Sequence, residues 1–364
     1  MSSVSETKVI HDKLYTLDQT LNRQTMHTFF EPFVPERLGS NFELLGLEIE
    51  VMRRRNQRCV IRYILDVFER KSLKRLQWRI VGKVYKANRG EKTYEDMQTL
   101  WNAGFHRQAD DEMFIPEAFD FSSPLCLLLQ EEIPGHAVKD ILAREEVRPE
   151  TMRIVARTIA KLHGLDARFG RAYSIDDHLM RCHPRYPFLA LACPEHEAKI
   201  DYIVDTAKRV EQAFGEIKLG PAHGDFHMGQ LHINHDTAYL IDFDPICHAD
   251  PASDIGNLLV FQKNKARRDE KMHVYIDAFL DEYYNVMGRE VESRVPLYEG
   301  LTQLRRACKC LRYQDAKWRR KVDRMLNLGI SHIEKVAAEY IDGFAVSKPQ
   351  STSDFKRVKA EQLN

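Results

Sequence analysis

The sequence predicts a two-lobed α+β protein, in which a small antiparallel sheet with one helix precedes a larger and mostly helical part. Three observations support this prediction. Short apolar runs with alternating or β-branched residues dominate residues 42–133, and helical spacing dominates most segments from residue 138 onward. The stretch Ile133-Pro134-Gly135 marks the point where one pattern gives way to the other.

The predicted first lobe contains five strands and one helix. Three strands are expected at 42–52, 58–68 and 77–86, with charged turns such as RRRNQ between them. A helix is expected over 91–105, because Tyr94, Met97, Leu100 and Trp101 share one helical face and Gly104 can end it. Two more strands are expected within 114–123 and 125–133.

The predicted second lobe is helical, with one hairpin inside it. Helices are expected at 151–165, 198–214, 267–287 and 298–342. The hairpin consists of QLHI and AYLIDF, joined by a turn at Asn234-His235-Asp236. The expected organisation is a lead-in over 1–33, a sheet lobe over 34–131, a helical lobe over 132–345 and a disordered tail over 346–364.

Composition excludes several classes of protein. Lys plus Arg and Asp plus Glu both number 54, so the formal net charge is zero, which argues against nucleic acid or an anionic membrane as the main partner. The N-terminus lacks the apolar run of a signal peptide, and the longest apolar stretch, PLCLLL, is too short to span a bilayer. Seven cysteines without a CxxC pair indicate reduced thiols in a cytoplasmic protein.

The segment HGDFHMGQLHINHDTAYLIDFD, residues 223–244, is rich in histidine and aspartate and allows three interpretations. It can be a polar turn and hairpin whose histidines, such as His232 and His235, satisfy backbone groups. It can hold a transition metal, with His223, Asp225 and His227 as ligands and Asp242 or His248 completing the set. It can also serve phosphoryl transfer.

Phosphoryl transfer needs few protein groups, because catalysis there is positioning and charge neutralisation. Asp225 supplies a carboxylate for the proton of a substrate hydroxyl, and Gln230, five residues later, supplies an amide oxygen for a metal ion. Asp242 follows the apolar AYLI of the hairpin and can be the second metal ligand. Lys83 lies on a predicted strand, and Glu95 lies twelve residues later on the predicted helix.

Five separated motifs resemble the aminoglycoside phosphotransferase and choline kinase-like enzymes. HGDFHMGQ resembles their HGDxHxxN signature, and LIDFD resembles their metal-binding I-D-[FW]-[DE]. ADPASDIGNLL at 249–259 resembles the segment that follows, LLLQEEIPG resembles their hinge, and IAKLHGL matches their LxxLH helix. The resemblance covers about 36–320 of this sequence, with the motifs in the family's order.

The resemblance implies a bilobal protein-kinase-like fold and transfer of the γ-phosphoryl group of ATP, with Mg²⁺, to a hydroxyl of a small molecule. It implies a role for each matching residue: Asp225 as catalytic base, Asp242 and Gln230 as metal ligands, Lys83 as the phosphate-binding lysine with Glu95 as its partner, and the backbone of Gln130, Glu131 and Glu132 as the adenine contact. Asp254 is expected to support the catalytic loop, and the role of Asp244 stays open.

Two departures from the family pattern leave alternatives open. Gln230 replaces the usual Asn, although maltokinase-like members also carry Gln, and no G-x-G-x-x-G lies near the first strands. A degenerate kinase fold that binds without turnover is therefore the alternative to an active kinase. Lys86 is the alternative to Lys83. A sugar or similar hydroxylated metabolite is the first choice of acceptor, followed by an aminoglycoside and then an amino-alcohol such as choline; the oligomeric state is left open.

Overall fold

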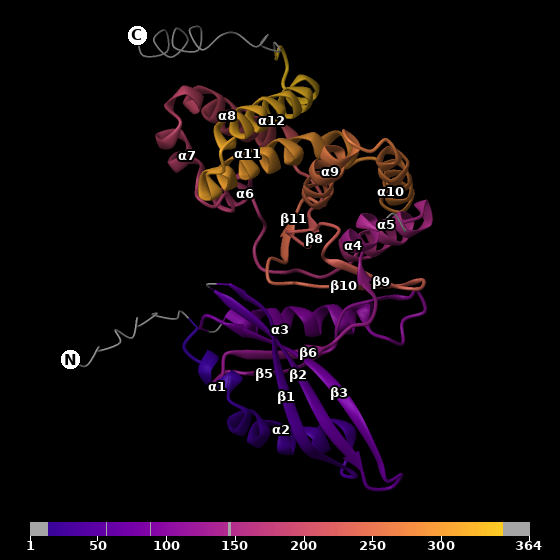
Figure 1. The fold of residues 1–364 in the computed structure, drawn as a ribbon. Coiled ribbons are helices and arrows are strands. Elements are labelled where there is room, and N and C mark those ends of the chain that lie inside the picture. Colours follow the sequence, from indigo (N-terminus) through magenta and orange to yellow (C-terminus); the bar gives the residue numbers. More distant parts are fainter. Residues whose placement is uncertain (1–13, 56, 88, 145–146, 345–364) are drawn as a thin grey trace, which may run out of the picture. The chain divides into compact units, whose positions relative to one another are not determined.

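The computed structural model describes residues 14–344 apart from residues 56, 88, 145 and 146, and it groups the chain into two compact units (Figure 1). Unit 1 is Met1–Gly135 together with His232–Asp244, and unit 2 is His136–Leu231 together with Pro245–Asn364. The predicted α+β class is confirmed, because unit 1 contains an antiparallel sheet and unit 2 is mostly helical. The tail predicted at 346–364 lies outside the described residues.

Unit 1 is built on a five-stranded antiparallel sheet with the strand order β1-β2-β3-β6-β5. Its strands are β1 (Phe42–Arg55), β2 (Arg58–Glu69), β3 (Lys74–Tyr85), β5 (Ala118–Ser122) and β6 (Leu127–Glu131). Its helices are α1 (Leu17–Leu21), α2 (Arg23–Leu38) and α3 (Arg89–Leu100), and the single π-type turn Trp101–Phe105 extends α3. The five predicted strands of the first lobe and its predicted helix are therefore all present.

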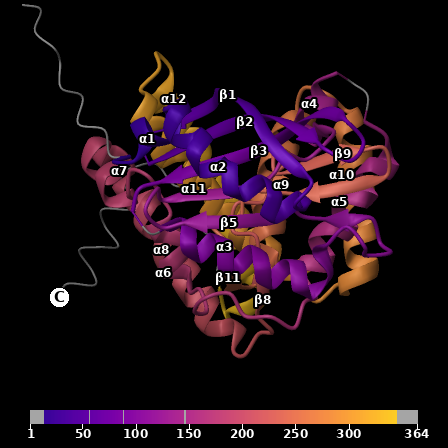
Figure 2. The same ribbon diagram turned by 90° about the horizontal axis from the view of Figure 1, so that it is seen from below.

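One face of the sheet is buried under α1 and α2. On β2 the apolar residues alternate, so that Ile61, Tyr63 and Leu65 all point toward this face and are fully buried. The Tyr63 hydroxyl donates a hydrogen bond to the Thr20 carbonyl at 2.9 Å, and its ring meets Phe30 of α2 edge-on at 5.1 Å between centroids. Figure 2 shows α2 lying across β1, β2 and β3.

The predicted lead-in over 1–33 is not separate from the sheet lobe. Helix α2 begins at Arg23 after Asn22, whose side chain accepts a hydrogen bond from the Thr25 N–H, and it continues through the predicted boundary at residue 34. Met26, Phe30, Phe33 and Val34 are buried, which is the i, i+4, i+7, i+8 spacing of a helix packed against a core. Pro32 and Pro35 within the helix weaken this signal in the sequence.

The hairpin at 231–240 joins unit 1, although the predicted lobe boundaries place it in the helical lobe. It consists of β9 (Leu231–Asn234) and β10 (Thr237–Leu240). Strand β10 pairs in parallel with β4 (Met113–Phe114), and the Ala238 N–H donates to the Glu112 carbonyl at 2.9 Å. This pairing joins segments more than a hundred residues apart, so it cannot be predicted from local sequence patterns.

Unit 2 contains nine α-helices among the described residues: α4 (Val138–Ala143), α5 (Pro149–His163), α6 (Ile175–Met180), α7 (Tyr186–Ala192), α8 (Glu197–Phe214), α9 (Ala252–Ala266), α10 (Lys271–Met287), α11 (Val295–Tyr313) and α12 (Trp318–Tyr340). The helix predicted over 298–342 is two helices, because Gln314 adopts a left-handed conformation (φ 44°) that ends α11. A short antiparallel pair, β8 (Gly220–Ala222) and β11 (Cys247–Ala249), lies among the helices.

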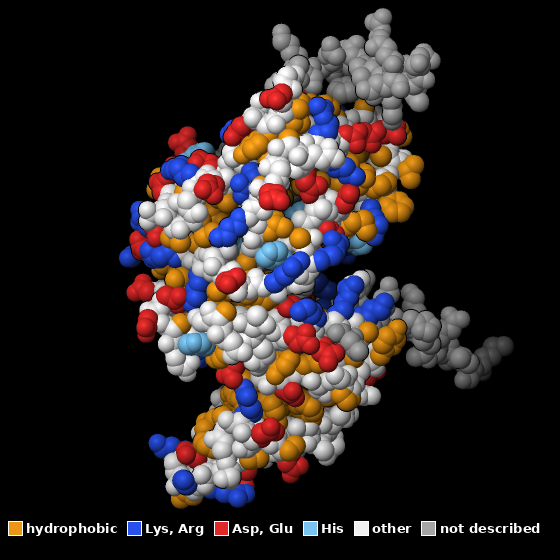
Figure 3. Space-filling view, turned by 180° about the vertical axis from the view of Figure 1, so that it is seen from behind, with side chains coloured by type: hydrophobic (Ala, Val, Ile, Leu, Met, Phe, Trp, Pro, Cys, Tyr) orange, Lys and Arg blue, Asp and Glu red, His pale blue; other side chains and the backbone are white. Residues whose placement is uncertain are grey.

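The cysteines, the charged side chains and the length of the helices can be compared with what the composition predicts. None of the seven cysteines, all within the described residues, forms a disulfide, and five of them are buried. Side chains of both charges are interspersed on each unit in the view of Figure 3. Within the described part of the chain, no helix has the length and apolar character required to cross a membrane.

We expect Phe30→Ala to destabilise unit 1 strongly, because a buried aromatic ring is lost and the cavity under β2 cannot collapse fully. The expected loss in the free energy of unfolding is about 3–5 kcal/mol. Hydrogen exchange of the β2 amides measures it. Val51→Ala on β1, where the side chain is 50% exposed, is the control and should change stability by less than about 0.5 kcal/mol. Equal effects of the two substitutions would contradict the packing of α2 described above.

Candidate active site

The loop that begins at His223 is held by one buried carboxylate. Strand β8 ends at Ala222, and the next two backbone N–H groups, those of His223 and Gly224, donate to the two Asp254 oxygens at 2.6 and 2.9 Å. Asp254 lies in the first turn of α9 and is 1% exposed. The acidic group at this helix N-terminus is favoured by the helix dipole, so α9 and the loop stabilise the same charge.

Asp254 also binds the histidine of the LxxLH helix. Nε2 of His163, the last residue of α5, lies 3.2 Å from Asp254 Oδ2, and Nδ1 of His163 lies 2.7 Å from the Tyr283 hydroxyl on α10. Burial raises the pKa of Asp254, but the hydrogen bonds from His163 and from the His223 backbone outweigh burial and hold this pKa below its usual value. Two motifs recognised separately in the sequence therefore meet at one buried hydrogen bond.

The conformation of the loop explains why glycine precedes Asp225. Gly224 has φ +77°, and a Cβ built there would lie 2.2 Å from the Pro245 carbonyl oxygen, so a larger residue cannot be accommodated. On the other side of Asp225, the Asn257 amide of α9 donates to the Phe226 carbonyl at 2.8 Å. The backbone on both sides of Asp225 is thus fixed by α9, while the Asp225 side chain is only half-buried.

The histidines of this loop serve its turns. His227 Nδ1 accepts from the Gly229 N–H at 2.9 Å, and the Gln230 N–H donates to the His227 carbonyl at 2.9 Å. Gln230 itself is buried. Among the described residues, no three His, Cys, Asp or Glu side chains gather as a metal site would require. The transition-metal interpretation, with His223, Asp225 and His227 as ligands, therefore finds no support in the geometry.

Lys83 and Asp242 meet on unit 1. The register of β2 and β3 places Lys83 opposite Val60, on the face of the sheet that α2 does not cover. Lys83 is buried, and its Nζ lies 3.8 Å from Asp242 Oδ1. Asp242 follows β10 with φ +69°, a left-handed conformation that aspartate tolerates better than most residues. Lys86, the alternative phosphate-binding lysine, is exposed.

Arg58 contacts both carboxylates of the LIDFD motif, and sequence reasoning did not find it. Its guanidinium donates to Asp242, with Nη2 at 3.0 Å from Oδ2, and also to Asp244. Burial lowers the pKa of Arg58. The hydrogen bond to Asp242 and the charges of both aspartates raise this pKa by more than burial lowers it, so the net shift is upward. In the sequence, Arg58 follows RRRNQ and looks like one more charge of an exposed turn.

Tyr85 completes this group of side chains. It pairs with Arg58 across β2 and β3, and its hydroxyl donates to Asp244 Oδ1 at 2.7 Å. Burial, followed by the nearby Asp244 charge, raises the pKa of Tyr85 well above its ordinary value, so the hydroxyl keeps its proton. Two carboxylates here face two cations, Arg58 and Lys83, and the charges balance.

Glu95 does not meet Lys83, so the expected orienting pair is replaced by Lys83 with Asp242. Glu95 lies on the exposed side of α3 with 62% of its side chain accessible, and its carboxylate is 3.8 Å from Lys92. The next residue, Asp96, is the buried acid of this helix and accepts a hydrogen bond from Lys92 at 2.7 Å. Neighbouring residues of an α-helix point about 100° apart around its axis, so Glu95 is exposed where Asp96 is buried. The sequence alone does not determine which side of α3 faces the sheet.

The expected adenine contacts divide between a strand and the segment after it. Gln130 and Glu131 belong to β6, where they pair with Val81 and Ile80 of β3, and the Glu131 N–H donates to the Glu117 carbonyl at 2.9 Å. Glu132 follows the strand and pairs through its side chain with Arg62. Backbone groups of Gln130 and Glu131 are therefore largely engaged in the sheet, whereas Glu132 lies beyond it.

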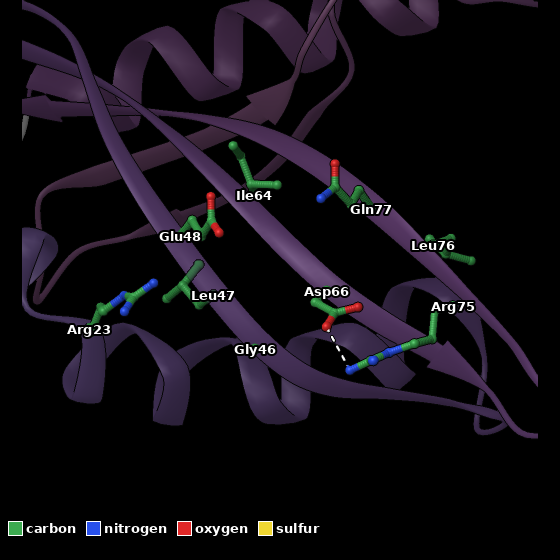
Figure 4. A pocket seen from close by; sticks show the side chains of 9 residues that line it. All are labelled: Arg23, Gly46, Leu47, Glu48, Ile64, Asp66, Arg75, Leu76 and Gln77. Carbon is green, nitrogen blue, oxygen red and sulfur yellow. Dashed lines mark hydrogen bonds and ion pairs between the residues drawn. The ribbon is translucent and has the colours of Figure 1, made fainter.

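A cavity of about 440 Å³ on unit 1 contains none of these residues. Figure 4 shows its lining from α2 and from β1, β2 and β3, with an ion pair of 3.0 Å between Asp66 and Arg75. The remaining residues drawn there are Arg23, Gly46, Leu47, Glu48, Ile64, Leu76 and Gln77. It is a polar hollow between surface side chains of the sheet, and the chemistry-bearing residues lie elsewhere.

We expect Asp254→Asn to destabilise unit 2 by about 3–5 kcal/mol at neutral pH, because breaking a buried ion pair leaves its partner groups unsatisfied. The pKa of Asp254 is lowered by folding, so its contribution is present above the ordinary aspartate pKa near 4 and is lost as the pH falls through the folded value. Urea unfolding at several pH values measures the difference. The difference in the free energy of unfolding between Asp254→Asn and the unmodified protein should shrink below about pH 4. Asp176→Asn, at an exposed aspartate, should change the free energy of unfolding little.

Known proteins resemble this chain in sequence and in fold. The model of the phosphotransferase enzyme family matches residues 86–289. A search of curated proteins gives no match. Solved structures do match. A choline/ethanolamine kinase family protein from Mesorhizobium loti is 14% identical, with a TM-score of 0.57 over 87% of this chain and 100% of its own.

Two further structures show the same fold at similar distance. A thermostable mutant of an aminoglycoside phosphotransferase, in ternary complex with ADP and hygromycin B, is 12% identical, with a TM-score of 0.54 over 84% of this chain and 98% of its own. An amicoumacin kinase in complex with AMP-PNP, Ca²⁺ and its substrate is 12% identical, with a TM-score of 0.53 over 89% and 99%. The family match covers more than half of the chain, so this protein belongs to the phosphotransferase enzyme family.

Proposed function

We propose that this phosphotransferase transfers the γ-phosphoryl group of ATP to a hydroxyl of a small molecule, with Mg²⁺ as the metal ion. The observation that carries the proposal is the loop clamped by Asp254, which presents Asp225 from a backbone fixed on both sides. A positioned carboxylate of this kind can accept the proton of an attacking hydroxyl. The acceptor oxygen would then bind to phosphorus as the bond from the γ-phosphorus to the bridging oxygen breaks, and ADP would leave.

Lys83 is the proposed phosphate contact. Its ammonium is buried on a central strand and faces Asp242, so its position is fixed before a nucleotide binds. The solved neighbours support a nucleotide, since one contains ADP and another contains AMP-PNP. For the adenine, we propose the backbone beyond β6, at Glu132, as the contact, because Gln130 and Glu131 are paired within the sheet. A role for Glu95 in orienting Lys83 has no support in the structure.

Asp242 fits the proposed role of metal ligand, together with Gln230. The two carboxylates already bind a cation, because Asp242 and Asp244 both accept hydrogen bonds from the Arg58 guanidinium. A pair of carboxylates that holds one cation is suited to hold a metal ion. Hard divalent cations prefer such oxygen ligands. When bound, Mg²⁺ neutralises charge on the nucleotide phosphates, and Arg58 would then give up its bonds to Asp242. Gln230 would supply its amide oxygen from the catalytic loop.

A binding protein without turnover is the alternative, because Gln230 replaces the usual Asn. A thermal shift with ATP, measured with and without Mg²⁺, reports binding, and phosphorylation of a panel of sugars, amino-alcohols and aminoglycosides reports turnover. For the acceptor we propose a sugar-like or similar hydroxylated molecule. The named ligands of solved neighbours, hygromycin B and amicoumacin, support a small-molecule acceptor in general. The free thiols support a cytoplasmic location.

We expect Asp225→Asn and Asp242→Asn to fail differently. Asp225→Asn removes the proposed base but not the nucleotide contacts, so kcat should fall by roughly two to four decades while ATP binding stays nearly intact. Asp242→Asn removes a charge from the proposed metal site, so Mg²⁺-dependent binding of ATP should be lost together with turnover. Isothermal titration with ATP, with and without Mg²⁺, separates the two variants. If ATP bound to both with unchanged affinity, Asp242 would not be a metal ligand.

We also expect Lys83→Ala to weaken ATP use while Lys86→Ala does not. Lys83 is buried beside Asp242, whereas Lys86 is exposed at the end of β3, so the two substitutions are a matched pair. Loss of the buried charge should raise the KM for ATP and lower kcat, because a phosphate-binding cation acts through charge and placement. Steady-state kinetics and circular dichroism together check this. The reverse result would assign the phosphate contact to Lys86.

A further inference from the structure

A small cavity of about 20 Å³ in unit 2 lies beside the residue that carries the proposed chemistry. Gly224, which directly precedes Asp225, forms part of its wall, and Asn257, which holds the catalytic loop, forms another part. Its other polar lining comes from Arg181, directly after α6, from Arg305 of α11, and from His178, Ser253, Tyr298 and Thr302. The space is about that of one or two water molecules, so it admits one small group of a larger ligand.

The charge of the cavity is positive. Burial and, after it, the nearby Arg181 charge lower the pKa of Arg305 to about 10, although the Asp225 charge opposes this shift. Burial and the same two arginines lower the pKa of His178 to about 3, so this histidine is neutral at physiological pH. Burial is the largest cause of both shifts, and the positive charges of the arginines act in the same direction, so bringing further positive charge into this space costs free energy.

The nearby carboxylates are engaged elsewhere. Asp254 is bound by His163 and by two backbone N–H groups, and Asp177 forms an ion pair with Arg171. Asp225 opposes the arginine charges, but a single carboxylate does not balance two guanidinium groups. Among the described residues, the Asp254 and Asp177 carboxylates thus pair with His163 and Arg171 and not with Arg181 or Arg305. The cavity is therefore an unbalanced positive site next to the catalytic loop.

A buried hydroxyl in the same wall lacks a partner. Ser253 is 7% exposed, and its Oγ has no hydrogen-bond partner among the described residues. Such a group costs about 1–3 kcal/mol unless something binds to it. Guanidinium groups only donate hydrogen bonds, and a serine hydroxyl can donate one as well. A wall that combines these donors favours an anion, because charge-assisted hydrogen bonds are the strong ones.

We propose that this cavity is the acceptor subsite and that it binds an anionic group, a carboxylate or a phosphate, of the molecule whose hydroxyl is phosphorylated. The inference rests on the proposed function and narrows its substrate class to hydroxylated acids such as sugar acids or sugar phosphates. Arginine binds both anions with paired hydrogen bonds, and the cavity has room for one or two oxygen atoms of such a group. A polycationic aminoglycoside or a choline would place positive charge against Arg181 and Arg305.

Arg305 has a second role that decides which variant tests the proposal. It donates a hydrogen bond to the Asn257 side chain, and Asn257 in turn holds the Phe226 carbonyl beside Asp225. Substituting Arg305 would disturb the catalytic loop directly. Arg181 has no such link to the loop in the structure, so it is the residue to change. Arg185, an exposed arginine four positions later that does not line the cavity, provides the matched control.

The experiment is calorimetric binding to the full chain without nucleotide, using gluconate, glucose 6-phosphate, inorganic phosphate, glucose and choline as probes. We expect at least one anionic probe to bind at least tenfold more tightly than glucose and choline. Arg181→Gln should weaken that binding roughly tenfold or more, Arg181→Lys should retain part of it, and Arg185→Gln should leave it unchanged. Gluconate against glucose 6-phosphate distinguishes carboxylate from phosphate.

Turnover with ATP and Mg²⁺ is measured separately, so the two proposals can fail independently. Anion binding that depends on Arg181 without any phosphorylation would support the subsite and count against the kinase. Phosphorylation of neutral or cationic acceptors that is insensitive to Arg181→Gln would support the kinase and overturn the subsite. Equal binding of glucose and gluconate, no binding of any anionic probe, or equal losses in Arg181→Gln and Arg185→Gln would also overturn it.

Discussion

The loop that carries Asp225 depends on the burial of one carboxylate. A charged group at the depth of Asp254 is tolerated only when donors surround it, and here the donors are the His163 ring and the N–H groups of His223 and Gly224. The His163 ring belongs to α5 and the two N–H groups belong to the loop that begins at His223. Because the same charge satisfies α5, the loop and the first turn of α9, none of the three can move without leaving a polar group unpaired. Asp225 takes its position from this constraint.

Unit 1 relies on the strict alternation of its strands. Residues such as Ile61 and Tyr63 point toward α2 and form the core, so their neighbours Arg58 and Val60 must point to the opposite face together with Lys83 and Tyr85. That face carries the charges around Asp242 and Asp244. The helices that cover one face therefore leave the other available for polar chemistry, and the balance of two cations against two carboxylates keeps it compatible with folding.

Different parts of the site were accessible to sequence reasoning to different degrees. Asp225, Asp242, Asp254 and Lys83 can be named as candidates from the sequence, because each lies in a short motif or on a strand whose pattern is local. Arg58 was missed because its role depends on the pairing of β2 with β3 and on a hairpin almost two hundred residues away. The exposed position of Glu95 could not be predicted, because composition and spacing do not determine the rotation of α3 about its axis.

The sequence by itself determined the strands and most helices, the link at Ile133-Pro134-Gly135 and the order of the chemical motifs, because hydrophobic periodicity and glycine or proline positions act over a few residues. Only the tertiary structure decided which side chains meet. It paired β10 of the hairpin at 231–240 with β4 of unit 1, packed α2 against the five-stranded sheet, and placed Arg181 and Arg305 around one cavity. Such contacts join residues far apart in the chain, and their free energy depends on burial and register, which no local pattern encodes.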